Sequence, residues 1–225
     1  MDRERLKQLA SEKAVEEVKS GMIVGLGTGS TVYYALLKLG EWVRDGLDIV
    51  GIPTSAATEE IAAAQGIPLS TLEKHPVIDL TIDGADEVDT NLNLIKGGGG
   101  ALVREKIIAH ASKKLIIVVD EGKLSECLGT NFYLPVEVLQ FGWQATQRAL
   151  NKICRESTLR RADGAPFVSD NGNCILDCHF DAIPHPGETE LQLNNIPGSV
   201  ENGLFVNRAD KVVIGTASGV ETKER

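Results

Sequence analysis

The stretch "MIVGLGTGSTVYYALLKLGEWVRDGLDIVGIP", residues 22–53, decides the fold. It begins with the strand-like apolar run "MIVGLG" and ends with a second such run, "LDIVGIP". Between them, residues 30–44 have the pattern of a helix. Strands that alternate with helices favour a parallel sheet, because each helix returns the chain to the end of the sheet where the previous strand began.

The same unit recurs along the chain. Further strand-like runs are "VIDLTID" at 77–83, "KLIIVVD" at 114–120 and "KVVIGT" at 211–216. Further helical patterns cover residues 2–19, 56–65 and 100–112. The sequence therefore predicts an α/β fold with a mostly parallel, doubly wound, Rossmann-like sheet covered by helices on both faces. In such sheets ligands bind beyond the carboxyl ends of the strands.

The pattern changes near residue 131. Strands are expected in "LPVEVL", "STLRR", "CILDCHF" and "GLFV", and helices in "WQATQRALNKI" and "ETELQLNNI". This is the β-α-β-β-α-β order of a split-βαβ, ferredoxin-like domain. We therefore expect a large α/β domain formed by residues 1–130 and 206–225, with a small α+β domain, residues 131–205, inserted.

Composition excludes several classes of protein. The 225 residues are 42% hydrophobic and 24% charged, as in ordinary soluble globular proteins. A formal net charge of −9 argues against nucleic-acid binding, which uses basic surfaces. The charged N-terminal segment lacks the apolar core of a signal peptide, and no apolar run is long enough for a membrane helix. We expect a cytoplasmic protein with no membrane partner.

The four cysteines offer a weak case for zinc. A zinc site would recruit Cys174, Cys178, His179 and His185, but Cys-x3-Cys lacks the usual spacing and the segment alternates like a strand. We expect the cysteines to be small buried hydrophobes and the chain to bind no metal.

The first strand runs into "GLGTGST", residues 25–31. The dinucleotide fingerprint would need glycine in place of Ser30, and a Walker A loop would need a lysine. The loop is either an anion-binding helix N-terminus or a plain capped turn, and the residues leave both open. After the second strand, Thr54 and Ser55 are expected to be N-caps.

The third strand ends in "DGADEVD", which places Asp83, Asp86, Glu87 and Asp89 within seven positions. Crowded carboxylates raise one another's pKa, which suits proton transfer. A cation-binding turn and a solvated loop remain alternatives. Lys123, after the fourth strand, reaches the same edge of the sheet, although alone such a lysine is more often a surface residue.

The glycine run Gly97–Gly100 lies between Lys96 and Glu105. Without Cβ atoms, its backbone can approach a ligand closely and direct N–H groups at it. Glu105 has apolar helical neighbours such as Leu102 and Ile108, so desolvation would raise its pKa and make it a better base. Alternatively, it only favours the helix macrodipole. Together the loops suggest a site for a small phosphorylated, hydroxyl-rich molecule.

These motifs resemble the type A ribose-5-phosphate isomerase family. "GLGTGST", "DGADEVD", "KGGGGALVREK" and "VDEGK" have the order and spacing of that family, and "DGAPFVSDNGNCILDC" and "IPGSVENGLF" are similar to its later segments. Thr90 departs from it, where many members have proline. The resemblance implies interconversion of D-ribose 5-phosphate and D-ribulose 5-phosphate in the non-oxidative pentose phosphate pathway. It also implies no cofactor, and a homodimer or a dimer of dimers.

The resemblance also implies residue roles. Glu105 would be the base that moves a proton between C2 and C1 through a cis-enediolate, and Lys96 would stabilise the oxyanion. Asp83 and Asp86 would bind hydroxyls, and one of them would help to open the sugar ring. The further substrate-binding residues implied are Lys7, Thr28, Gly29, Ser30, Thr31, Gly84, Ala85, Gly97, Gly98, Gly99 and Lys123.

Other functions remain possible from the residues. An aminosugar-phosphate deaminase or isomerase of the same architecture would share the phosphate site but release ammonia from glucosamine 6-phosphate. A coenzyme A transferase would need a coenzyme-binding segment, which is not found around the glutamate. A non-catalytic sugar-phosphate sensor is the alternative outside enzymes.

Overall fold

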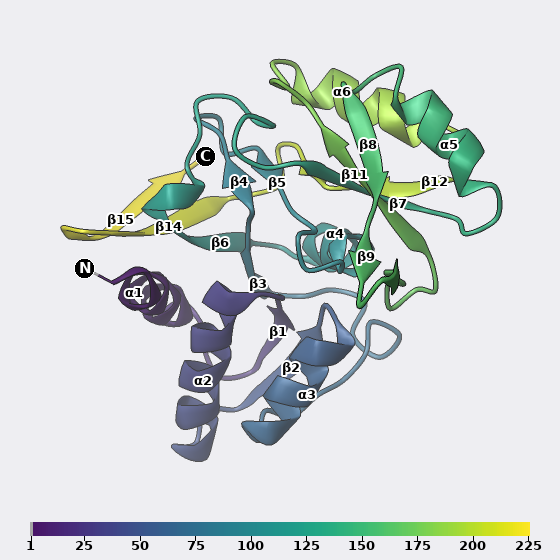
Figure 1. Cartoon of the computed structure of the whole chain (residues 1–225). Coiled ribbons are helices and arrows are strands. Elements are labelled where there is room, and N and C mark those ends of the chain that lie inside the picture. The colour runs from purple at the N-terminus through teal and green to yellow at the C-terminus, as the bar shows by residue number, and fades with distance from the viewer. Residues whose placement is uncertain (1) are drawn as a thin grey trace. The chain divides into compact units, whose positions relative to one another are not determined.

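The computed structural model describes residues 2–225, which form two compact units (Figure 1). The first unit contains the residues up to Ala85, with Arg104–Lys123 and Arg208–Arg225. The second unit contains Asp86–Val103 and Leu124–Asn207. This division assigns residues 86–103 to the same unit as the segment from 124 onward, whereas the sequence suggested the large domain for them. The boundaries 1–130 with 206–225, and 131–205, stay a prediction.

The first unit is built on a six-stranded sheet with the strand order β15-β14-β6-β3-β1-β2. Its strands are β1 (Met22–Leu26), β2 (Ile49–Pro53), β3 (Leu80–Gly84), β6 (Leu115–Asp120), β14 (Lys211–Thr216) and β15 (Gly219–Glu224). All neighbours are parallel except β14 and β15, which form an antiparallel hairpin. The mostly parallel sheet and the return of "KVVIGT" to it are confirmed, and β15 is an edge strand that the sequence analysis missed.

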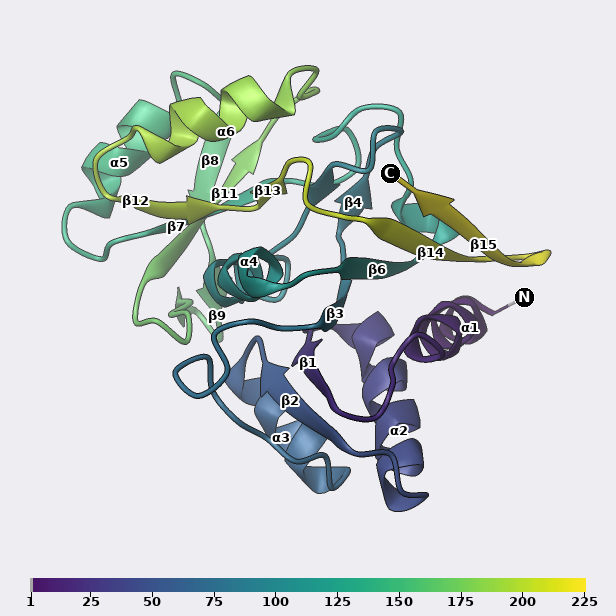
Figure 2. The ribbon, with the colours of Figure 1, turned by 180° about the vertical axis from the view of Figure 1, so that it is seen from behind.

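Helices cover both faces of this sheet, as Figures 1 and 2 show from opposite sides. The helices are α1 (Arg3–Val15), α2 (Ser30–Arg44), α3 (Ala56–Ala64) and α4 (Leu102–Ala111). The first three share an apolar core with Val24 and Leu26 of β1. In contrast, Ile108 of α4 packs with Ile52, and Ile23 packs against the same cluster. Because side chains alternate along a strand, these two clusters lie on opposite faces.

Two glycines allow helices to approach the sheet closely. A Cβ atom on Gly25 would lie 2.9 Å from Cγ2 of Ile108 in α4, and one on Gly215 would lie 2.0 Å from the backbone oxygen of Leu6 in α1. Such distances are well below ordinary contact, so only glycine fits there. The start of α1 is thereby held at the carboxyl end of β14.

The second unit contains a four-stranded antiparallel sheet with the order β12-β7-β11-β8. Its elements follow the chain as β7 (Leu134–Val138), α5 (Trp143–Leu150), β8 (Glu156–Leu159), β11 (Cys174–His179), α6 (Pro186–Asn194) and β12 (Ser199–Asn202). A short hairpin of β9 (Arg161–Ala162) and β10 (Ala165–Pro166) lies between β8 and β11 in the chain. The element order is the β-α-β-β-α-β order expected from the sequence.

The closing strand of this sheet was predicted wrongly. Residues 199–202, not "GLFV", pair with β7, and Leu204–Phe205 forms β13 in a separate three-stranded sheet with the order β13-β5-β4. In that sheet β4 is Glu87–Val88 and β5 is Leu94–Ile95. Two-residue strands give almost no periodic signal, so their pairing depends on partners that are distant in the sequence.

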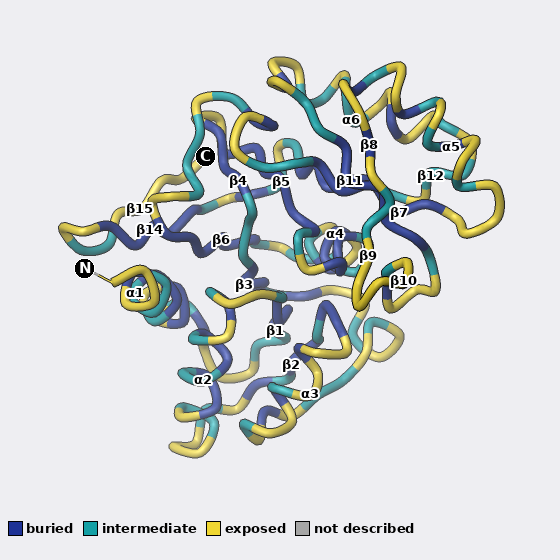
Figure 3. The backbone as a smooth tube through the Cα atoms, in the orientation of Figure 1, coloured by how far each residue is buried: buried dark blue, intermediate teal, exposed yellow. Residues whose placement is uncertain are grey.

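Burial follows these layers (Figure 3). In the second unit Cys154, Cys174 and Cys178 belong to the apolar core, as predicted, whereas Cys127 is only partly buried. Among residues 2–225, no group of three or more His, Cys, Asp or Glu side chains is arranged to hold a metal ion. The described helices include none that is both long and apolar enough to cross a membrane.

Glu87 has a structural role that its acidic neighbourhood did not reveal. Its carboxylate is fully buried and accepts hydrogen bonds from Gly129 N at 2.9 Å, Asn131 N at 3.2 Å and the Thr130 hydroxyl at 3.2 Å. It therefore fastens the segment 129–131 beside β4. A solvated loop, one of the alternatives for "DGADEVD", does not describe this residue.

We expect Glu87→Ala to lower the free energy of unfolding by about 2–4 kcal/mol, because the buried Gly129 N–H group and the partly buried Asn131 N–H group both lose a charged acceptor. Urea denaturation monitored by circular dichroism measures the change. Exposed Glu126 of the same unit provides the matched control, Glu126→Ala, with an expected change near zero. Equal midpoints for the two variants would contradict the structural role of Glu87.

Candidate functional site

Asp83 is fixed at the carboxyl edge of the parallel sheet in the first unit. It lies in β3, is fully buried, and its Oδ1 atom accepts hydrogen bonds from Thr28 N at 3.1 Å and Gly84 N at 2.8 Å. A Cβ atom on Gly27 would lie 2.2 Å from the same Oδ1 atom. The second glycine of "GLGTGST" is therefore needed so that the loop can approach Asp83 and hold its carboxylate.

The hydroxyl of Thr28 belongs to a polar cluster behind this loop. Its Oγ1 atom lies 2.7 Å from Thr54 Oγ1, 2.8 Å from Ser55 Oγ and 3.0 Å from Thr58 Oγ1. Ser55 caps α3 by accepting from Thr58 N at 3.1 Å, which confirms the predicted cap. Thr54 donates instead to the backbone oxygen of Leu26, at 3.0 Å. The Thr28 side chain thus joins the β1 loop to the start of α3.

The rest of the loop provides an exposed helix N-terminus. Gly29 precedes α2 with φ of 123°, a conformation that favours glycine, and Ser30 and Thr31 are the first two residues of the helix. Gly29 and Ser30 are exposed. Backbone N–H groups in the first turn of a helix favour anions, so this end of α2 is suited to a phosphate group.

Two lysines belong to the same edge of the first unit. Lys123 ends the short 3-10 helix Glu121–Lys123, which directly follows β6. Lys7 follows Leu6, whose backbone contacts Gly215 near the end of β14, and its Nζ atom lies 2.7 Å from Glu4 Oε1. Because β14, β6, β3 and β1 are parallel, their carboxyl ends share one edge. Both lysines therefore belong to the edge that carries Asp83.

Glu105 lies in the first turn of α4 and is only 4% exposed. Ile108, one turn later, packs in the apolar cluster described above. The sequence-based expectation of a carboxylate on an apolar helix face therefore agrees with the burial of both residues. A buried carboxylate near a helix start has fixed geometry, which a general base needs.

In the second unit, the short sheet positions Asp86 and Lys96. Strands β4 and β5 are antiparallel with Glu87 opposite Ile95, so Asp86 and Lys96 come just outside the same end of the pair. Asp86 N donates to Ile95 O at 2.8 Å. Lys96 is 1% exposed, its N–H donates to Gly203 O at 2.9 Å, and its Nζ atom lies 5.5 Å from the centre of the Phe205 ring. A buried ammonium group of this kind is suited to stabilise negative charge.

The glycine run that follows Lys96 forms a tight loop. Gly97 and Gly100 have φ of 98° and 84°, and Gly100 N donates to Gly97 O at 2.9 Å. Gly98 N donates to Asp86 Oδ2 at 2.7 Å. Cβ atoms on Gly98 and Gly100 would lie 2.6 Å from Asp86 Oδ1 and 2.5 Å from the Phe167 ring. The backbone conformation and close contacts explain why glycine occupies these positions.

We expect Gly98→Ala to reduce kcat/KM by about 10–100-fold without unfolding the protein. The new methyl group would meet the flexible end of Asp86, which can move away but then loses its bond to the loop. Steady-state kinetics on the substrate proposed below provides the measurement. Gly187→Ala is the control, because its nearest neighbour would be 3.9 Å away, and equal activity of both variants would contradict the prediction.

The structure separates the four acids of "DGADEVD". Asp83 and Asp86 are held by backbone N–H groups of the two loops, whereas Glu87 holds the distant segment 129–131 and Asp89 supports its own turn. Asp89 Oδ1 accepts from Asn91 N and Asn93 N, both at 2.8 Å, and so closes the turn between β4 and β5. Of the predicted residues, those from Lys7 to Ala85, Glu105 and Lys123 belong to the first unit, and Asp86 and Lys96–Gly99 to the second.

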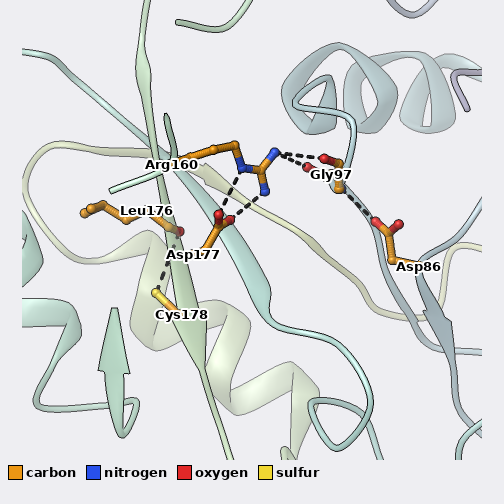
Figure 4. A network of polar contacts seen from close by, with 7 residues as sticks. Asp86, Gly97, Arg160, Leu176, Asp177 and Cys178 are labelled. Carbon is orange, nitrogen blue, oxygen red and sulfur yellow. Dashed lines mark hydrogen bonds and ion pairs between the residues drawn. The ribbon is translucent and has the colours of Figure 1, made fainter. Parts of the chain in front are cut away.

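The sequence analysis missed a pair that supports the glycine loop. Arg160 Nη1 donates to Gly97 O at 2.9 Å and to Gly98 O at 3.0 Å, and Asp177 accepts from its Nε and Nη2 atoms (Figure 4). These residues lie more than sixty positions from the loop in the chain. No local pattern in "STLRR" or "CILDC" could have indicated the contact.

Comparison with known proteins covers nearly the whole chain. A family model described as ribose 5-phosphate isomerase A (phosphoriboisomerase A) matches residues 50–219. Ribose-5-phosphate isomerase A from Gloeobacter violaceus is 54% identical over 222 residues, covering 98% of this chain and 96% of the relative. The protein of the same name from Bacillus mycoides is 51% identical, covering 96% of this chain and 98% of the relative.

Solved structures agree with the sequence relatives. A D-ribose-5-phosphate isomerase in complex with phospho-erythronic acid is 42% identical with a TM-score of 0.97, and 100% of both chains is covered. Ribose 5-phosphate isomerase from Plasmodium falciparum is 44% identical with a TM-score of 0.95, covering 99% of both chains. The chain therefore belongs to the ribose 5-phosphate isomerase A family.

Proposed function

We propose that this protein is an aldose–ketose isomerase that interconverts D-ribose 5-phosphate and D-ribulose 5-phosphate. The observation that carries the proposal is the burial of three charged side chains, Asp83, Lys96 and Glu105, in a chain of this family. Burying a charged group costs free energy unless it is paired or hydrogen-bonded. Buried charged side chains are therefore candidates for a functional role. A proton transfer at a carbon next to a carbonyl group uses both a base and a cation.

Each of these side chains has one role in the proposed reaction. Asp83 or Asp86 binds sugar hydroxyls and assists opening of the ring. Glu105 removes the proton from C2 of the open aldose and delivers it to C1, so that a cis-enediolate lies between the two steps. Lys96 stabilises the negative oxygen that develops as the proton leaves, and a buried site strengthens this attraction because water does not screen it.

The phosphate group of the substrate binds at the start of α2, apart from the groups that transfer the proton. The N–H groups and hydroxyls of Gly29, Ser30 and Thr31 at the start of α2 receive its oxygens, and Lys7 and Lys123 neutralise its charge. Lys7 also pairs with Glu4 at 2.7 Å, which offsets part of its positive charge.

The remaining assignments rest on the family and the composition. We propose a cytoplasmic enzyme of the pentose phosphate pathway that needs no cofactor and assembles as a homodimer or a dimer of dimers. The antiparallel sheet of the second unit, with α5 and α6, supports the proposed small ferredoxin-like domain inserted into the α/β domain.

The test is the formation of ribulose 5-phosphate from ribose 5-phosphate, followed by ketose absorbance in the presence of EDTA. We expect full turnover with the chelator, since acid–base groups and Lys96 supply the chemistry. Strong inhibition that magnesium reverses would instead assign a metal to the carboxylate cluster. Ammonia release from glucosamine 6-phosphate without ribose 5-phosphate turnover would indicate a deaminase, and binding of ribose 5-phosphate without turnover a sensor.

A further inference from the structure

We propose that Arg160, held by Asp177, is a positioning residue that fixes the peptide orientations of the glycine loop and so directs the Gly99 N–H group at the substrate. The inference rests on the isomerase function proposed above. It concerns residues of the second unit alone, so the geometry that carries it lies within that unit.

The glycine loop has unusual conformational freedom. A peptide flanked by glycines on both sides can rotate between orientations at little cost, because no Cβ atom blocks the alternatives. The peptides joining Gly97 to Gly98 and Gly98 to Gly99 are both of this kind. Without an anchor, their N–H groups would point in several directions, and a catalytic donor needs one direction.

Arg160 anchors this loop. Arg160 Nη1 lies 2.9 Å from Gly97 O and 3.0 Å from Gly98 O, so one group of the guanidinium fixes both carbonyl oxygens. In a trans peptide the N–H group points away from the C=O group of the same plane. Turning both carbonyls toward Arg160 therefore turns the N–H groups of Gly98 and Gly99 away from it.

The Gly98 N–H group has the direction that these carbonyl contacts require. Gly98 N–H donates to Asp86 Oδ2 at 2.7 Å, and in Figure 4 Asp86 lies on the other side of Gly97 from Arg160. Gly99 is exposed, and the same geometry turns its N–H group away from Arg160. Asp86 and Gly99 are both positions at which the family resemblance implies substrate contacts.

Arginine suits this position because its guanidinium group can bind Asp177 and the loop at the same time. Its Nε and Nη2 atoms bind both oxygens of Asp177, at 3.0 and 2.5 Å, which leaves Nη1 for the loop. The side chains of Arg160 and Asp177 are only 10% and 11% exposed, so each neutralises the other in a largely buried place. The rings of Tyr133 and Phe167 lie 5.6 and 5.8 Å from the guanidinium carbon and confine it further. A lysine could not form this planar set of bonds.

The experiment compares Arg160→Met, Asp177→Asn and the control Arg155→Met. Arg155 is an exposed arginine of the same unit that pairs with Asp181 and does not contact the loop. We expect Arg160→Met to lower kcat by about 10²-fold, the scale of a misplacement of about 1 Å, with a KM within about threefold of the original. Asp177→Asn should lower kcat by a smaller factor, and Arg155→Met should have the same kcat and KM as the unaltered protein.

Two further measurements distinguish positioning from mere folding. With substrate deuterated at C2, the isotope effect on kcat should rise in Arg160→Met, because a misdirected loop slows the proton transfer; loss of folded protein alone leaves this ratio unchanged. In protein labelled with ¹⁵N-glycine, the Gly98 and Gly99 amide signals should shift in Arg160→Met and stay in place in Arg155→Met.

Each outcome decides the question. An unchanged isotope effect with unchanged glycine signals overturns the inference, as does a kcat within threefold of the original protein. If Arg160→Met does not fold, Asp177→Asn carries the same measurements with the same criteria. Absence of turnover in the unaltered protein overturns the proposed function, while the glycine signals still test whether Arg160 orients the loop.

Discussion

Glu105→Gln is expected to lower kcat for ribose 5-phosphate by about 10²–10⁴-fold, the usual contribution of a positioned acid–base group. Glutamine has nearly the same shape as glutamate, so the packing around this 4%-exposed side chain in α4 should persist. The amide cannot accept the C2 proton at neutral pH. Binding should change little, because the proposed phosphate and hydroxyl contacts belong to other residues.

The measurement combines kcat with solvent exchange. In deuterium oxide the active enzyme should introduce deuterium into the sugar, and Glu105→Gln should lose this exchange together with turnover. Exposed Glu59 in the same unit gives the control Glu59→Gln, which should retain both. A loss of less than tenfold in Glu105→Gln would reject Glu105 as the base.

Lys96→Met is expected to lower kcat by about 10²–10³-fold, the typical cost of removing a group that stabilises a developing oxyanion. Methionine matches most of the length of lysine and can pack beside Phe205, so the short sheet of β4, β5 and β13 should remain folded. The proton-transfer step should be slowed most, because the negative charge on the substrate oxygen is greatest after the proton has left C2.

A binding comparison makes this prediction specific. Phospho-erythronic acid, with which a related isomerase has been solved, carries a carboxylate that resembles a charged enediolate. Lys96→Met should weaken the binding of this ligand much more than the binding of inorganic phosphate. The exposed control Lys152→Met should weaken the binding of neither. Equal weakening of both ligands by Lys96→Met would mean that Lys96 serves the phosphate and not the oxyanion.

The sequence predicted the parallel sheet well because its central strands are buried on both faces. β6 is the clearest case: all six of its residues are buried, and "LIIVVD" is continuously apolar up to Asp120. The helix between β1 and β2 was also predicted with its observed bounds, Ser30–Arg44. Local composition carries this information because a strand buried on both faces must be apolar at every position.

The sequence failed where pairing is short or distant. The closing strand of the four-stranded sheet was placed at "GLFV" because this run is more apolar than residues 199–202, which pair with β7. The sequence suggested a single acidic cluster that contains Asp86, Glu87 and Asp89. In the structure each has a different partner, among them backbone groups about forty residues away.

The sequence by itself determined the family, the chemical groups and their order along the chain, because motifs such as "DGADEVD" and "KGGGGALVREK" are contiguous. Only the tertiary structure decided which acids hold the backbone, why Gly27 and Gly98 must lack a side chain, and that Arg160 supports the glycine loop. The contacts of Gly98 with Asp86 and of Gly97 with Arg160, for example, join residues 12 and 63 positions apart. Such distances arise when separate strands pack together, and no local pattern of residues encodes them.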